Sequence, residues 1–111
     1  MNSSITNTIL WATIEDFAGL WEILWEVNIS LSDKNETQNK ELTKETLTHF
    51  LNKGFVKCYR STWGIDDLVE ISSTKAIEFL DEENYWQPPK LDDPCLKFGC
   101  TEEGEVYYKK N

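Results

Sequence analysis

The stretch CLKFGCTEEGEVYYKK, residues 95–110, carries the most information about the fold. Its first six residues read as a strand, and Thr101 is followed by two acids and Gly104. Thr can cap a helical turn, acids suit the positive end of a helix, and Gly permits a close approach or a left-handed residue. We therefore expect a strand over residues 95–100 that leads into a helical turn or a second strand.

The rest of the chain predicts further helices and strands around this stretch. Apolar residues at helical spacing, caps and stop signals predict three helices, at residues 14–29, 44–53 and 74–84. Alternating residues predict two more strands, at residues 55–60 and 68–72. The chain is therefore expected to be a small α+β protein with three helices and a small antiparallel sheet.

The domain organisation is simple at this length. The 111 residues are enough for one domain with a packed core. Residues 1–11 are rich in Asn, Ser and Thr and are expected to form an N-terminal arm whose last part packs on the domain. Residues 12–111 are expected to form that single domain.

Two phrases resemble the winged-helix family. TLTHFLNKGFVKCYR, residues 46–60, is similar to the phrase in which a short helix ends at Gly and leads into a strand. LKFGCTEEGEVYY, residues 96–108, is similar to the phrase in which the last wing strand enters T-x-x-G. The resemblance implies a winged-helix-like domain. The whole chain also resembles small bacterial proteins of unknown activity that share a Trp-Pro-Pro-like stretch and a TEEGE-like end.

The charge of the chain restricts its partners. Twenty acids against eleven bases give a net charge of −9. Residues 1–33 hold five acids and no Lys or Arg, residues 34–60 have a local charge of +3, and residues 61–111 one of −7. An acidic surface repels nucleic acids and anionic membranes. No run approaches the roughly 20 apolar residues of a membrane span, so we expect neither partner.

Aromatic residues supply a candidate protein interface. The apolar arc of the helix predicted at residues 14–29 is wide for a peripheral helix. The helix is therefore either central in the domain or in contact with another chain. Aromatic residues in two loops have the same two interpretations, as core plugs or as anchors for a partner. The candidate interface residues are Trp21, Trp25, Trp63, Tyr85 and Trp86.

The favoured function is a non-catalytic protein-interaction module, which binds another protein or a second copy of itself as a homodimer. An alternative is a DNA-binding transcription regulator of winged-helix type. Residues 74–84 are too acidic to contact DNA, whereas residues 46–53 and the wing region offer polar and basic side chains. The candidate DNA contacts are Thr46, Thr48, His49, Asn52, Lys53 and Lys97. A third interpretation, from charge alone, is an acidic protein that neutralises a toxin or mimics DNA.

The sequence indicates no chemistry of its own. The only His, His49, has no Ser or Cys near it in sequence, and no Gly-rich phosphate loop is present. With Cys58, Cys95 and Cys100 it could form a zinc set. However, Cys95 and Cys100 lie five steps apart and would point to opposite faces of a strand. We expect no catalytic, cofactor-binding or metal-binding residues, no small-molecule substrate and no enzymatic activity.

The expected location is cytoplasmic. The first 17 residues lack a basic segment and meet acids before any long apolar run, so they do not resemble a secretory signal. An odd number of cysteines, three, fits reduced thiols in the cytoplasm.

Overall fold

An antiparallel pair of long strands, β2 and β4, forms the centre of the sheet. Cys58 of β2 lies opposite Phe98 of β4, and both side chains are buried in the core. Two short strands complete the sheet at its edges, in the order β1-β4-β2-β3. The strands are β1 (Ala18–Gly19), β2 (Val56–Thr62), β3 (Val69–Ile71) and β4 (Pro94–Cys100).

Helices account for most of the remaining chain. The computed structural model describes residues 3–65 and 67–110, and within them it has five α-helices and one short 3-10 helix. The chain is therefore an α+β protein, as expected, but with more helices than the three predicted. The helices are α1 (Ser3–Glu15), α2 (Leu20–Ser30), α3 (Glu36–Lys53), α4 (Ser73–Phe79) and α5 (Glu102–Lys110), with the 3-10 helix η1 (Glu83–Trp86).

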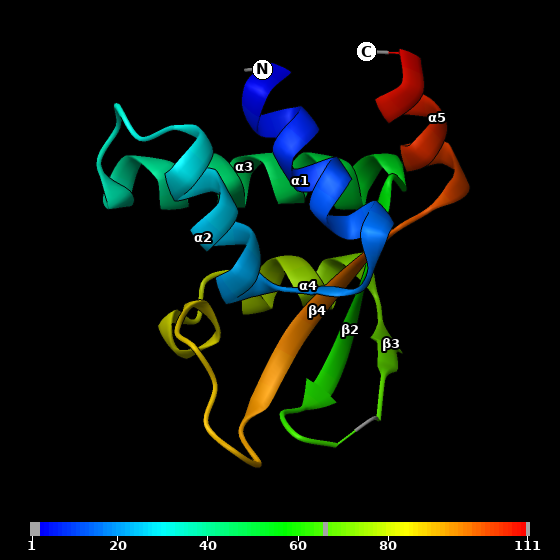
Figure 1. Ribbon diagram of the computed structural model, residues 1–111. Helices are drawn as coiled ribbons and strands as arrows, with labels where there is room; N and C mark the ends of the chain where they lie inside the picture. The colour runs from blue at the N-terminus through cyan, green and yellow to red at the C-terminus, as the bar shows by residue number, and fades with distance from the viewer. Residues whose placement is uncertain (1–2, 66, 111) are drawn as a thin grey trace.

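The helices and the sheet form two parts of one domain. In Figure 1, α1, α2, α3 and α5 lie together above the sheet, whereas α4 lies behind it. The first turn of α1 and the last turn of α5 both lie at the upper end of this view. The core is formed where helices and sheet meet. Its largest fully buried side chains are Ile5, Ile9, Leu10, Leu20, Ile23, Leu47, Phe50, Leu80, Leu96 and Phe98, with Val27 and Val56.

The N-terminal region differs from the prediction. Residues 1–11 were expected to form an arm, but the chain is helical from Ser3 and buries three large apolar side chains of α1. The predicted helix at residues 14–29 is interrupted at β1, between α1 and α2. The reason is local hydrogen bonding. The Asp16 carboxylate accepts the Phe17 N–H at 2.7 Å, and the Glu22 carboxylate accepts the Gly19 N–H at 3.0 Å.

The middle helices also have other bounds than predicted. Helix α3 begins at Glu36 because Asn35 caps it: the Asn35 side chain accepts the Gln38 N–H at 2.8 Å. Helix α3 therefore begins eight residues before the helix predicted at residues 44–53. Its predicted end is confirmed, at Gly54 with φ 75°. The third predicted helix, residues 74–84, is divided into α4 and η1.

The closing stretch ends in a helix. Residues 102–110 form α5, so of the two alternatives for this region the structure has the helical one. Thr101 caps α5, since its Oγ1 accepts the Gly104 N–H at 3.1 Å and donates to the Gly54 carbonyl oxygen at 2.6 Å. Gly104 is required because a Cβ there would lie 2.1 Å from the Phe55 carbonyl oxygen.

Candidate functional site

Helix α2 presents a row of large apolar side chains away from the core. Trp21, Trp25 and Ile29 follow one another at four-residue spacing, which places them on one face of the helix. Trp25 is 60% exposed and Ile29 56% exposed, whereas the opposite face of α2 is buried. The wide apolar arc predicted for this helix is therefore divided between two environments. One face of α2 packs in the core, and the other is exposed on the surface.

The row continues from α2 onto the loop after β2. The rings of Trp21 and Trp63 meet edge to face, with centroids 6.2 Å apart. On the other side of Trp63, the Lys97 ammonium lies 5.8 Å from the ring centroid. Three of the five predicted interface residues, Trp21, Trp25 and Trp63, are thus adjacent on the surface.

The row also reaches the face of the sheet opposite Cys58 and Phe98. Lys97 pairs across the sheet with Tyr59, and the Tyr59 ring meets Phe17 edge to face at 5.0 Å. Phe17 lies over Gly99, where a Cβ would come within 2.7 Å of its ring. We use the name aromatic band for this continuous surface, which consists of Trp25, Trp21, Trp63, Tyr59 and Phe17.

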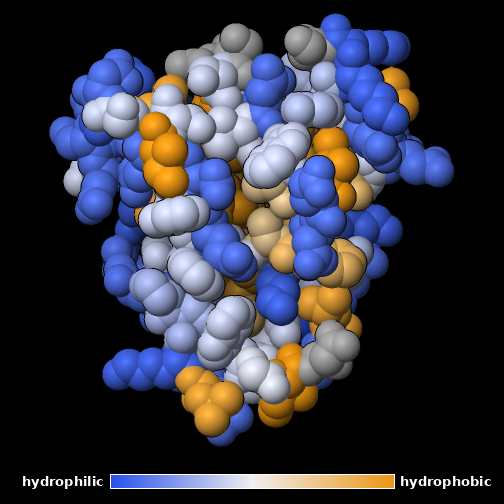
Figure 2. Space-filling view, in the orientation of Figure 1, coloured by the Kyte–Doolittle hydropathy of each residue, from blue (hydrophilic) through white to orange (hydrophobic). Residues whose placement is uncertain are grey.

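The aromatic band belongs to the side of the molecule on which α2 lies. Figure 2 shows pale side chains, which have intermediate hydropathy, gathered over this side. Strongly hydrophilic side chains are most abundant along the margins of the view, and strongly apolar ones lie in separate places at the upper left, the right and the lower end. An aromatic region with a charged margin is typical of protein interfaces.

A shallow hollow of about 680 Å³ lies at the sheet end of the aromatic band. Phe17 and Tyr59 form its apolar wall, while Lys53 and Lys57 contribute cations. Glu102 and Glu103, from the first turn of α5, contribute anions, so the hollow has no single charge. It therefore gives no preference for one class of charged ligand.

Tyr85 and Trp86 are not part of the surface. They belong to η1 and are 6% and 3% exposed, and the Trp86 Nε1–H donates to the Leu80 carbonyl oxygen at 2.9 Å. Their placement corresponds to the core-plug interpretation, because the chain turns here before two prolines. We therefore leave both residues out of the candidate interface.

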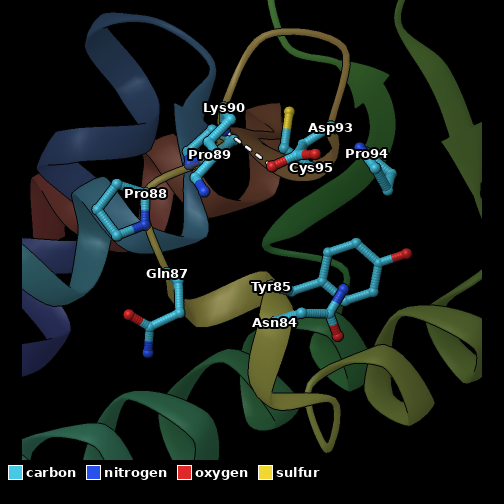
Figure 3. A pocket seen from close by; sticks show the side chains of 9 residues that line it. All are labelled: Asn84, Tyr85, Gln87, Pro88, Pro89, Lys90, Asp93, Pro94 and Cys95. Carbon is cyan, nitrogen blue, oxygen red and sulfur yellow. Dashed lines mark hydrogen bonds between the residues drawn. The ribbon is translucent and has the colours of Figure 1, made fainter.

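The proline stretch forms a small hollow of about 280 Å³ beside η1. In Figure 3, Pro88 and Pro89 lie across this hollow from Tyr85. The Asp93 carboxylate accepts the Lys90 N–H at 2.9 Å, which holds the loop in shape. The hollow is lined mainly by loop backbone and prolines, so we assign it no chemical activity.

The candidate DNA contacts are scattered. Thr46 is only 2% exposed, and its Oγ1 donates to the Leu42 carbonyl oxygen at 2.7 Å. Thr48 makes the same kind of bond inside α3, to the Lys44 carbonyl oxygen at 2.8 Å. Of the other predicted residues, His49, Asn52 and Lys53 are exposed at helical spacing at the end of α3, whereas Lys97 lies on β4 beside Trp63.

The three cysteines are free thiols with different surroundings. Cys95 lies opposite Ser61 and Cys100 opposite Val56, so their side chains point to opposite faces of the sheet, as predicted. Burial raises the pKa of the Cys58 thiol to about 12 and also raises the pKa of the Cys95 and Cys100 thiols. Among residues 3–65 and 67–110, no three His, Cys, Asp or Glu side chains form a metal-binding group.

Sequence reasoning missed two members of the aromatic band, Phe17 and Tyr59, and also Ile29, which lies beside the band. Phe17 was expected to lie within the single helix predicted at residues 14–29. The Gly-x-x-Glu spacing from Gly19 to Glu22 was the signal that could have revealed the helix start, and with it the release of Phe17 to the surface.

The chain was also compared with known proteins. A scan against protein-family models and searches of curated proteins and of solved structures returned no match. In the part of the chain that the structure describes, no helix is long and apolar enough to cross a membrane. The function is therefore argued from the surface of the chain alone.

Proposed function

We propose that the protein is a non-catalytic interaction module that binds another protein through the aromatic band. The observation that carries this proposal is the 60% exposure of Trp25 on a helix that also contributes to the core. Trp and Tyr are enriched among the residues that dominate binding energies. A contiguous group of them on a surface marks an interaction site more often than a chance exposure does.

The rigidity of the band supports the same proposal. Trp21, Trp63 and Lys97 hold one another in place, as do Phe17 and Tyr59. Preorganised side chains lose little conformational entropy on binding. Free thiols fit a reducing compartment, so we propose a cytoplasmic location and a cytoplasmic partner.

The partner can be another protein or a second copy of the chain. Affinity capture with tagged protein from its own cell extract tests the proposal, with and without nuclease. We expect Trp25→Ala to abolish capture of the partner, and Val69→Ala to leave it unchanged, because Val69 is exposed on the edge strand β3, on the sheet face opposite Tyr59. Partners that are captured equally by the wild type and by Trp25→Ala would contradict it.

A DNA-binding regulator of winged-helix type is the alternative. The T-x-x-G turn and the helix that ends at Gly54 support the winged-helix comparison, whereas the buried Thr46 and the three acids in the first turn of α5 oppose DNA contact. Duplex DNA binding at low salt, where the electrostatic contribution is strongest, would favour this alternative. A toxin-neutralising or DNA-mimicking protein is supported only by the net charge of −9.

A further inference from the structure

Helices α1 and α2 contribute acids but no Lys or Arg to the surface beside Trp25. Residues 1–33 contain five acids and no Lys or Arg. Two of these acids, Glu22 and Glu26, lie on α2 beside Trp25 and Ile29 at helical spacing. Among the described residues, neither Glu22 nor Glu26 takes part in an ion pair. The negative charge beside the exposed apolar side chains is therefore not neutralised within the chain.

Helix α1 adds a second exposed Trp to this surface. The Thr8 Oγ1 donates to the Ser30 Oγ at 3.1 Å, so the middle of α1 lies beside the end of α2. Figure 1 shows the two helices running in opposite directions. Trp11, which is 49% exposed, comes three residues after Thr8, and Glu26 comes four residues before Ser30, so each lies about one turn from this contact. The two helices together form a surface with two exposed Trp rings and acidic side chains between or beside them.

The two exposed Trp rings on the helices, Trp25 and Trp11, lack a neighbour that Trp63 and Trp86 have. Lys40 lies over Trp86 at 5.3 Å, and Lys97 lies over Trp63 at 5.8 Å. Among the described residues, no Lys or Arg lies over the ring of Trp25 or Trp11. A cation on the face of such a ring is favourable, and a nearby carboxylate strengthens the attraction.

We propose that the occupant of this surface is a basic, amphipathic segment of another protein. This inference rests on the proposed function and specifies the chemistry of its partner. Lys or Arg side chains of the segment stack on Trp25 and Trp11 and pair with Glu22 and Glu26, while apolar side chains cover Ile29. The row from Trp21 to Ile29 is about 12 Å long, so roughly two to three turns of helix cover it.

Charge excludes the competing occupants. In a two-fold dimer through this surface, a second copy of the chain would bring the same acids against themselves, and like charges at an interface are costly. Nucleic acid and anionic lipid carry the same sign of charge as Glu22 and Glu26. A basic segment is the occupant that makes favourable contacts with both the aromatic and the acidic side chains of this surface.

The inference is tested by selecting binders from a library of random peptides. The peptides have about 12 residues, which span roughly 18 Å as a helix. The full chain is the bait, and peptides that also bind Trp25→Ala are removed. We expect the selected peptides to carry net positive charge and at least one large apolar residue. Selected peptides that are neutral or acidic would overturn the basic partner but leave the proposed function standing. Failure to recover any peptide that needs Trp25 would count against both.

A pair of double variants with equal charge separates local pairing from overall attraction. Glu22→Gln with Glu26→Gln removes two charges beside Trp25, and Gln at position 22 can still accept the Gly19 N–H. Glu41→Gln with Glu45→Gln removes two exposed charges at the same four-residue spacing on α3 and serves as the matched control. We expect the first pair to weaken binding of a selected peptide about tenfold and the control to weaken it less than about twofold. Equal weakening would overturn the inference.

Sedimentation equilibrium completes the test. The wild-type chain is expected to be monomeric in the concentration range of the binding measurements. A dimer that Trp25→Ala dissociates would identify a second copy as the occupant, which overturns the basic partner while it supports an interaction module. Circular dichroism of every variant shows that a loss of binding does not reflect a loss of fold.

Discussion

Trp86 and Trp25 are the same residue type on two sides of one helix, and they differ in almost everything else. Trp86 packs beside Leu24 of α2, is 3% exposed and has its Nε1–H bonded to the Leu80 carbonyl oxygen. Trp25 points outward from α2 and is 60% exposed. Both lie in stretches that the sequence identified as candidate interfaces. The difference shows that a Trp in the sequence does not by itself distinguish core packing from binding. The distinction requires its hydrogen-bond partner and the side chains that bury it.

The largest expected effect is on the buried member of the pair. Trp86→Ala leaves a cavity in the core and an unpaired Leu80 carbonyl, so we expect it to lower the free energy of unfolding by about 3–5 kcal/mol. Urea denaturation followed by circular dichroism measures this. Trp86→Phe keeps most of the ring but not the hydrogen bond and should cost clearly less. A loss below about 1 kcal/mol for Trp86→Ala would remove the contrast with Trp25.

The next effect concerns the connection between sheet and last helix. A Cβ at Gly104 would lie 2.1 Å from the Phe55 carbonyl oxygen and 2.7 Å from the Cys100 Sγ. Because backbone cannot move aside as a side chain can, we expect Gly104→Ala to destabilise the fold by about 1–3 kcal/mol. Gly54→Ala is the matched comparison, with φ 75° but nothing within 4 Å of its Cβ, and should cost about 1 kcal/mol from strain alone. A milder effect at Gly104 than at Gly54 would contradict the close approach.

The stability of the core is also expected to depend on pH, through the buried Cys58 thiol. Burial raises the pKa of Cys58 to about 12 from an ordinary value of 9.0. Because the unfolded chain loses this proton first, stability is complete below pH 9.0 and falls as the pH rises towards 12, by about 1 kcal/mol per pH unit. Denaturation at several alkaline pH values measures the slope. Cys58→Ala should make the slope shallower, and an identical slope in that variant would show that Cys58 does not titrate as expected.

The contrast between the two Trp residues also shows how far the sequence predicts this fold. The sequence located β2, β3 and β4 within one to two residues. The alternation is clearest in β2, where Val56 and Cys58 are buried and Lys57 between them is exposed. The helix at residues 14–29 was extended through β1, because the wide apolar arc concealed that Asp16 and Glu22 bond to backbone N–H groups at the break. Such side-chain bonds compete with a helix without changing its hydrophobic pattern.

The candidate site was predictable only in its composition. Trp21, Trp25 and Trp63 were all identified from the sequence, but no local pattern brings a loop after β2 against the start of α2. Their contact depends on β1 pairing with β4, at Ala18 with Phe98 and Gly19 with Lys97. The burial of Tyr85 and Trp86 depends likewise on α2, which η1 contacts from a distant part of the chain.

The smallest expected effect on stability is at the exposed member of the pair. Trp25→Ala removes a ring that is mostly in water and places the best helix former in an exposed helix, so we expect the free energy of unfolding to change by less than about 0.5 kcal/mol. The same variant should lose the partner. A side chain that costs nothing to remove from the folded chain, yet is needed for binding, contributes to a complex and not to the fold. If urea denaturation instead showed a loss above about 1.5 kcal/mol, Trp25 would stabilise the chain itself as Trp86 does, and the aromatic band would lose its most exposed member as an interface.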